Sequence, residues 1–173
     1  TRHELNANTQ QIYQLMEREL KRARLAGGGL PGQRFNANEE LPTLVDVLKR
    51  VYQQKSLVID YKIDPDCEYQ ADRNDMLELL GNLLDNACKW ASKRVSCELY
   101  CEHGLVIIIA DDGVGCDEDQ LLLLTERGVR IDENTSGSGL GLAIVKDIVE
   151  LYEGRLQFSR SEIGGLQVKV VMP

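Results

Sequence analysis

The sequence predicts an α+β fold, a two-layer α/β sandwich in which helices lie on one face of a mixed sheet. Three observations support this prediction. Residues 76–90 have the pattern of a buried helix, strand-like runs precede and follow that helix, and the last two runs flank a Gly164–Gly165 turn. Helices that alternate with strands, followed by a final pair of strands, are typical of a sheet covered by helices on one side.

The N-terminal part of the chain predicts a separate helical segment. Residues 8–26 place apolar side chains at helical spacing, and the glycines and proline of residues 27–32 cannot continue a helix, so we interpret them as a hinge. We therefore predict two parts. Residues 1–33 form a helix with its hinge, and residues 34–173 form the sandwich.

A helix and two strands are predicted between the hinge and the central helix. The helix runs from a cap near Asn38 to Tyr52, residues 57–63 alternate as a strand, and after a turn residues 67–70 make a short second strand. Asp72 is then the expected N-cap of the central helix.

The elements after the central helix are predicted from apolar runs and turn residues. In chain order they are a hairpin of strands 95–100 and 105–110, a short helix capped by Asp117 that runs through Leu124, a polar, Gly-rich loop or lid at 127–138, a helix at 139–151, and strands at 155–159 and 166–172. Residues 105–110 are apolar throughout, so we expect that strand to be fully buried.

The composition is that of one medium-sized domain with a short helical appendage. Of 173 residues, 43% are hydrophobic and 28% charged, and no apolar run approaches the length of a membrane span. The formal net charge of −8 argues against nucleic acid as the principal partner, because binding a phosphodiester backbone needs a basic face. Since the sequence begins at Thr1 without a signal-like segment, we expect a cytoplasmic piece of a longer protein.

The five cysteines include no Cys-x-x-Cys pair. Cys97 and Cys101 would share one face of a strand but stand about 13 Å apart, too far for a disulfide or a shared zinc ion. We therefore predict that all five are reduced thiols in a reducing compartment.

One edge of the central helix is polar. At 100° per residue, an arc of roughly 100° holds five polar side chains over about 16 Å of helix axis. They are Glu78, Asn82, Asp85, Asn86 and Lys89. Carboxamide and carboxylate oxygens suit Mg²⁺ and a lysine suits phosphate oxygens, so this edge is a candidate nucleotide site. The alternative is an ordinary solvated face, but two asparagines, which are poor helix formers, favour the site.

A second candidate motif, Asp111-x-Gly113-x-Gly115, follows the apolar strand. A carboxylate at a strand end can accept a hydrogen bond from the exocyclic amine of a purine, and glycines let the backbone approach the base closely. Because Asp-Gly pairs also mark ordinary turns, this first glycine motif does not identify a nucleotide site on its own. We predict that Asp112 is a turn residue.

The second glycine motif, Gly-Ser-Gly-Leu-Gly-Leu from Gly137 to Leu142, leads directly into an apolar helix. Glycines before a helix leave backbone N–H groups free to face phosphate, and the helix dipole favours negative charge there. A flexible linker is the alternative, but a linker would not continue into so apolar a helix. The spacing is neither that of the dinucleotide-binding motif nor that of a Walker motif, so another nucleotide fold is indicated.

In this order along the chain, the three motifs resemble the N, G1 and G2 boxes of the ATP-binding domain of sensor histidine kinases. The resemblance covers residues 34–173, and Gly164–Gly165 with the final strand resembles that family's closing hairpin. The run from Gly81 to Trp90 is most similar to the PhoQ-like branch, whose members sense divalent cations and envelope stress. The resemblance implies a Bergerat-type ATP-binding fold of the GHKL superfamily.

The resemblance also implies roles for individual residues. Asn82 would coordinate Mg²⁺, and Asn86 and Lys89 would contact the phosphates of ATP. Glu78 would lie beside the reacting phosphoryl group as a polarising or basic group, and Asp111 would bind the adenine amine.

Further positions follow from the same resemblance. Trp90 would lie against the nucleotide, where the family has Tyr or Phe, with a core role as the alternative, and Arg130 would reach the γ-phosphate. The residues of the two glycine motifs that would line the ATP site are Gly113, Gly115, Gly137, Ser138, Gly139, Leu140, Gly141 and Leu142. Thr125 stands where the family often has Phe ahead of the lid, so the packing that closes the lid is in question.

The function implied by the resemblance is that of a histidine kinase. The domain would donate the γ-phosphoryl group of ATP to a histidine on a dimerisation hairpin, for relay to a response regulator. The full-length protein would be a homodimer in the bacterial inner membrane. Two alternatives are an ATPase of the same superfamily, in which ATP gates dimer closure, and a nucleotide-binding scaffold without kinase activity.

Residues 8–26 resemble the second helix of that hairpin, and the helix with the phosphorylated histidine is not in this sequence. His3 is not that histidine, because the Pro of the family's acceptor box is replaced by Asn8. His103 is predicted to lie exposed in a hairpin turn.

Overall fold

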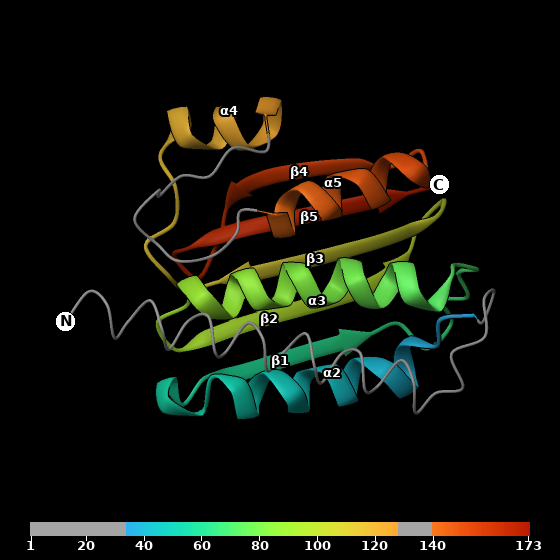
Figure 1. The fold of residues 1–173 in the computed structure, drawn as a ribbon, viewed down its shortest axis with the longest axis horizontal. Coiled ribbons are helices and arrows are strands. Elements are labelled where there is room, and N and C mark those ends of the chain that lie inside the picture. Colours follow the sequence, from blue (N-terminus) through green and yellow to red (C-terminus); the bar gives the residue numbers. More distant parts are fainter. Residues whose placement is uncertain (1–33, 128–139) are drawn as a thin grey trace.

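A mixed sheet of five strands, in the order β1-β2-β3-β5-β4, forms one layer of the computed structural model, which describes residues 34–127 and 140–173 (Figure 1). The strands are β1 (Val58–Ile63), β2 (Arg94–Cys101), β3 (Leu105–Asp111), β4 (Arg155–Arg160) and β5 (Leu166–Met172). β1 pairs with β2 in parallel, and the other three pairs are antiparallel. The predicted mixed sheet is therefore confirmed.

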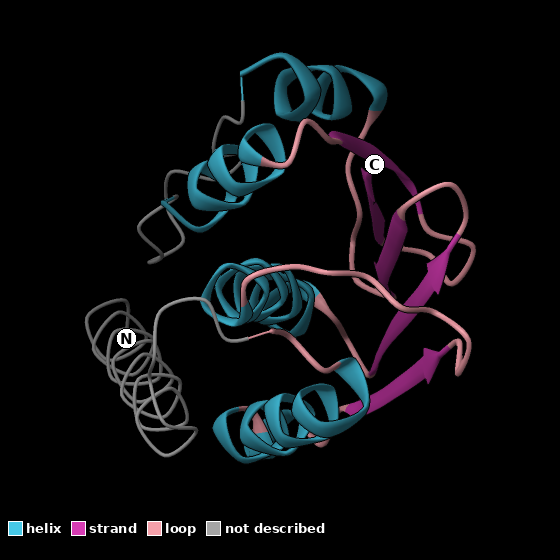
Figure 2. Ribbon diagram, turned by 90° about the vertical axis from the view of Figure 1, so that its right-hand side faces the viewer, coloured by secondary structure: helices cyan, strands magenta, loops and turns pink. Residues whose placement is uncertain are grey.

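The second layer consists of helices on one face of this sheet, as Figure 2 shows. They are α2 (Ala37–Val51), the short 3-10 helix η1 (Gln53–Lys55), α3 (Arg73–Trp90), α4 (Glu118–Arg127) and α5 (Leu140–Leu151). α3 lies between α2 and α5 and contacts both (Figure 1). The predicted two-layer α/β sandwich is confirmed, and none of the described helices is long and apolar enough to cross a membrane.

The core lies between the two layers. Along β2, Val95, Cys97 and Leu99 are buried while the intervening residues are exposed, as expected for a strand with one covered face. In β3, every residue except Ile108 is buried, because this strand lies between β2 and β5. Asp111 is therefore the last residue of the central strand of the sheet.

Three predicted elements differ from the structure. The helix α4 continues to Arg127, although its prediction ended at Leu124. Asn36, rather than Asn38, is the N-cap of α2, and its side chain accepts a hydrogen bond from the backbone N–H of Asn38. Residues 67–70 do not form a strand, because they lie outside the ladder that ends at Ile63 and belong to the irregular segment before α3. Asp72 is the N-cap of α3, as predicted, and accepts from the N–H of Asp75.

The prediction that all five cysteines are reduced is wrong for two of them. Cys67 and Cys101 form a disulfide with their Cα atoms 5.0 Å apart. Because β1 and β2 are parallel, the segment that leaves β1 passes the end of β2, where Cys101 lies. Cys97 lies on the same strand as Cys101 and is a free thiol, so these two cysteines are not bonded to each other, as predicted. Cys88, Cys97 and Cys116 are free thiols.

Several predicted features lie outside the residues that the structure describes. Two are segments, namely the N-terminal helix with its hinge and His3, and nearly all of the loop or lid. The others are the site residues Arg130, Gly137, Ser138 and Gly139. The hairpin turn that contains His103 is described, and His103 is exposed there, as predicted.

Candidate functional site

The polar edge predicted for α3 is half-buried in the folded chain. Glu78, Asn82, Asn86 and Lys89 are all partly covered, while Leu79, Leu80, Leu83, Leu84 and Ala87 between them are buried. Asp85 departs from this edge. Its carboxylate turns toward α2 and accepts a hydrogen bond of 2.5 Å from the hydroxyl of Tyr52.

Asn82 joins the asparagine motif of α3 to the second glycine motif. Its Nδ2 donates to the carbonyl of Glu78 over 2.7 Å, which orients the amide and leaves Oδ1 on the side of α5. A Cβ added to Gly141 would lie 3.1 Å from that Oδ1, so the first turn of α5 approaches Asn82 closely. Leu142 follows Gly141 and is half-buried against the core.

Asp111 lies at the end of β3 and is only 2% exposed. Its Oδ1 accepts from the backbone N–H groups of Gly113, at 2.9 Å, and Leu166, at 3.4 Å. Burial raises the pKa of Asp111, and these two backbone hydrogen bonds act against that shift. Since both bonds go to Oδ1, the second carboxylate oxygen is the one suited to accept a hydrogen bond from a ligand amine.

The first glycine motif is shaped by close backbone contacts. At Gly113 a Cβ would overlap the carbonyl oxygen of Trp90, the last residue of α3. Gly115 has φ +70 and lies against the carbonyls of the Gly164–Gly165 turn. The glycines therefore let the chain after β3 pass between the end of α3 and this turn.

Asp112 lies in the irregular segment that follows β3, directly before the bend at Gly113. Its carboxylate accepts hydrogen bonds from the backbone N–H groups of Ser92 and Lys93 over 2.9 and 3.0 Å. Slight burial would raise its pKa, but hydrogen bonds from backbone N–H groups, that of Lys93 first, lower it below its usual value. Asp112 thus fixes the loop that follows Trp90.

Two residues that sequence reasoning did not single out hold the C-terminal end of α3. Tyr52 bonds to Asp85, and the Nζ of Lys55 donates to the carbonyls of Cys88 and Lys89 over 2.8 and 2.9 Å. These contacts span 33 or 34 residues along the chain, and no local pattern predicts them.

The donor set near Asn82 fits Mg²⁺ only together with a ligand. Among residues 34–127 and 140–173, no three or more His, Cys, Asp or Glu side chains form a group that could hold a metal ion. Mg²⁺ often takes only one or two protein oxygens and completes its shell with waters and substrate phosphates. Asn82 Oδ1, whose amide is already oriented, suits that kind of site.

Comparison with known proteins shows the family to which the chain belongs. The model of the family "Histidine kinase-, DNA gyrase B-, and HSP90-like ATPase" matches residues 71–173. The chain is 45% identical to the sensor protein kinase CarS of Pseudomonas aeruginosa over 98% of its own length and 38% of that protein. It is 35% identical to the sensor protein PhoQ of Escherichia coli K12 over 88% of its length and 32% of that protein. The chain thus spans well under half of these curated relatives.

Solved structures show the same fold. The mycobacterial sensor histidine kinase MprB superimposes with a TM-score of 0.68 at 26% identity, covering 82% of this chain and 97% of that one. The catalytic domain of the histidine kinase ThkA gives a TM-score of 0.71 at 20% identity, which supports the fold alone. With a family model that matches more than half of its residues, the chain belongs to the histidine kinase-, DNA gyrase B- and HSP90-like ATPases and is similar, within them, to sensor histidine kinases.

Proposed function

We propose that this chain is the ATP-binding catalytic part of a sensor histidine kinase. It would transfer the γ-phosphoryl group of ATP to a histidine on a dimerisation hairpin, from which a response regulator takes it. Residues 34–173 would be the catalytic domain, and residues 1–33 the end of the hairpin with its hinge. The full-length protein would be a homodimer anchored in the bacterial inner membrane with this part in the cytoplasm.

The observation that carries the proposal is the meeting of the motifs along the C-terminal half of α3, from Asn82 to Trp90. Asn82 lies against Gly141, and Trp90 lies against Gly113, although the two residues of each pair are far apart in the sequence. A chance solvated face would not bring a carboxamide edge, a buried carboxylate and the start of a Gly-led helix together. This combination suits a ligand with a base at one end and phosphates at the other.

The proposed roles follow from the chemistry of each group. Asp111 accepts a hydrogen bond from the adenine amine through Oδ2, since its two hydrogen bonds with described residues both use Oδ1. Trp90 lies along the nucleotide, and its ring already has Lys89 Nζ 5.6 Å from its centroid. Asn86 and Lys89 contact the phosphates.

At the reacting end, Asn82 holds Mg²⁺, which neutralises phosphate charge when it is bound. Glu78, one helical turn before Asn82, lies beside the reacting phosphoryl group as a polarising or basic group, and Arg130 reaches the γ-phosphate. The backbone from Gly137 to Leu142 surrounds the phosphates at the start of α5.

The metal assignment is tested with Asn82→Ala. Loss of the one protein ligand should weaken binding of ATP with Mg²⁺ by at least about tenfold and reduce the dependence of affinity on Mg²⁺. Isothermal titration calorimetry with and without Mg²⁺ measures both effects. Asn74→Ala, in the first turn of the same helix, is the matched control and should bind as the wild type does. Equal affinity and equal Mg²⁺ dependence in Asn82→Ala would remove Asn82 from the metal site.

A further inference from the structure

We propose that Tyr52 and Lys55 are positioning residues for the proposed nucleotide site. They fix the last two turns of α3, which carry Asn86, Lys89 and Trp90. The inference rests on the proposed function of that site. It assigns part of the binding geometry to the end of α2 and to η1, which contribute no residue of the three motifs.

Tyr52 is the C-cap of α2 and is half-buried against α3. Its hydroxyl donates to Oδ1 of Asp85 over 2.5 Å and lies 3.4 Å from the carbonyl oxygen of the same residue. The Asp85 carboxylate is therefore directed toward α2. Because the next residue on a helix is rotated by about 100°, this contact also sets the direction in which Asn86 leaves α3.

Lys55 acts one turn further along α3. Its Nζ donates to the carbonyls of Cys88 and Lys89 over 2.8 and 2.9 Å. Both carbonyls belong to the last turn of α3, where a helix has no intrahelical donors left, and a cation there also opposes the negative end of the helix dipole. Lys55 thus caps the turn from which Lys89 and Trp90 project.

The charge of Lys55 is partly withdrawn from water at this position. Burial lowers the pKa of Lys55, and the surrounding Cys88, Asp111 and Asp112 act against that shift. The ammonium therefore lies among the groups that end α3 and β3. Replacing it with an apolar side chain would leave two helix carbonyls beside these carboxylates without a compensating cation.

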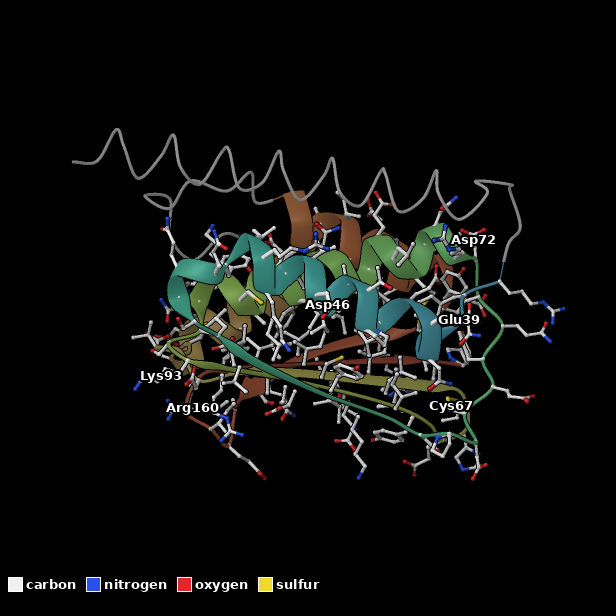
Figure 3. The ribbon with its side chains drawn as sticks, turned by 90° about the horizontal axis from the view of Figure 1, so that it is seen from below. Glu39, Asp46, Cys67, Asp72, Lys93 and Arg160 are labelled. Atoms are coloured by element: carbon white, nitrogen blue, oxygen red, sulfur yellow. A yellow bond between two sulfur atoms is a disulfide. The ribbon has the colours of Figure 1, made fainter. Side chains whose placement is uncertain are left out.

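The opposite end of α3 offers a matched comparison. The hydroxyl of Tyr152 donates to Oδ2 of Asp75 over 2.9 Å and accepts from the backbone N–H of Asp72 over 3.1 Å. This is again a tyrosine hydroxyl bonded to an α3 carboxylate, but it lies at the N-terminal end of the helix. Figure 3 shows Asp72 on the opposite side of the molecule from Lys93, which follows the C-terminal end of α3.

The test compares Tyr52→Phe and Lys55→Met with Tyr152→Phe in the whole chain. Trp90 is the single tryptophan, so its fluorescence reports binding of the ATP analogue AMPPNP in the presence of Mg²⁺. Tyr52→Phe and Lys55→Met should weaken AMPPNP binding about tenfold, whereas Tyr152→Phe should change it less than about twofold. Urea unfolding of each variant shows whether the affinity change follows a loss of stability.

Two further measurements separate positioning from general stability. Lys55→Arg keeps a cation that can donate to both carbonyls, so it should restore affinity to within about threefold of the wild type. Without nucleotide, acrylamide should quench Trp90 more strongly in Lys55→Met than in Tyr152→Phe, because the last turn of α3 is no longer capped.

The outcomes distinguish this inference from the proposed function. If the wild type binds AMPPNP and both variants at the C-terminal end bind equally well, the positioning role is wrong. If the wild type does not bind AMPPNP, the proposed function fails, and the quenching of Trp90 still decides whether Lys55 fixes the end of α3. Equal quenching in Lys55→Met and Tyr152→Phe would overturn the inference in that case as well.

Discussion

Gly165 is a residue at which the site depends on the absence of a side chain. Its backbone N–H donates to the carbonyl of Asp111 over 3.0 Å, and an added Cβ would overlap the Asp111 carboxylate. Asp111 is buried and cannot move away without breaking its bonds to Gly113 and Leu166. The turn that closes the sheet therefore also fixes the carboxylate proposed to recognise adenine.

We predict that Gly165→Ala lowers the affinity for ATP by about tenfold or more, because the displaced carboxylate no longer meets the adenine amine. Ile163→Ala is the control, since Ile163 is an exposed residue of the same turn. Calorimetric titration of both variants with ATP, together with their circular dichroism spectra, provides the measurement. A folded Gly165→Ala protein with wild-type affinity would contradict the role given to this glycine.

The residues of the site that could be predicted from the sequence are those in local motifs. Asn82, Asp111 and Gly141 each belong to a short pattern, and the structure brings the first and last together. Asp85 was placed on the polar edge because a helical projection does not show which neighbouring helix a side chain faces. Tyr52 was missed for the same reason, since its partner lies 33 residues further along the chain.

At the scale of elements, the disulfide ties the segment before α3 to the end of β2. Cys67 lies in that irregular segment, and Figure 3 shows it on the same side of the molecule as Asp72, the N-cap of α3. Cys67 and Cys101 are 34 positions apart. Closing a loop of that length in the unfolded chain stabilises the folded state by about 4 kcal/mol in the chain-entropy model.

We therefore predict that Cys101→Ser, or reduction with dithiothreitol, lowers the free energy of unfolding by about 2–4 kcal/mol. Urea unfolding monitored by circular dichroism measures the difference. Cys116→Ser should leave stability close to that of the wild type, since Cys116 is half-buried and a free thiol. If dithiothreitol has no effect on the wild type, the bond does not form in the isolated protein.

The elements were predictable where the hydrophobic period was clear. The hairpin of β2 and β3, the helix α5 and the final strands were all found within about two residues, because each is a continuous apolar or alternating run. The strand at residues 67–70 was wrong because alternation over four residues does not require a partner strand. The start of α2 was misplaced because Asn36 and Asn38 are both good N-cap residues.

At the scale of the whole molecule, the fold separates the proposed site from the histidine that the structure describes. His103 lies in the turn before β3, whereas Asp111 ends that strand. At about 3.4 Å per residue the two are separated by more than 20 Å. Phosphoryl transfer needs the attacking nitrogen about 3–3.5 Å from the γ-phosphorus. The γ-phosphate is proposed to lie near Asn82, between α3 and α5 in the helical layer, whereas His103 is exposed in a turn between two strands of the sheet, so we expect that His103 does not meet it.

A chain of these 173 residues should therefore bind ATP without phosphorylating itself. Neither His103, for the geometric reason above, nor His3, which lacks the Pro of an acceptor box, supplies an acceptor. A separate chain that contains a complete dimerisation hairpin with its histidine should become phosphorylated in trans, because the proposed nucleotide site is complete without it.

Incubation with ATP labelled at the γ-phosphate, with and without the hairpin chain, measures both expectations, and Asn82→Ala should abolish the transfer. Label on His3 of the lone chain would show that the acceptor was misidentified. Release of free phosphate without transfer to the hairpin would favour an ATPase over a kinase.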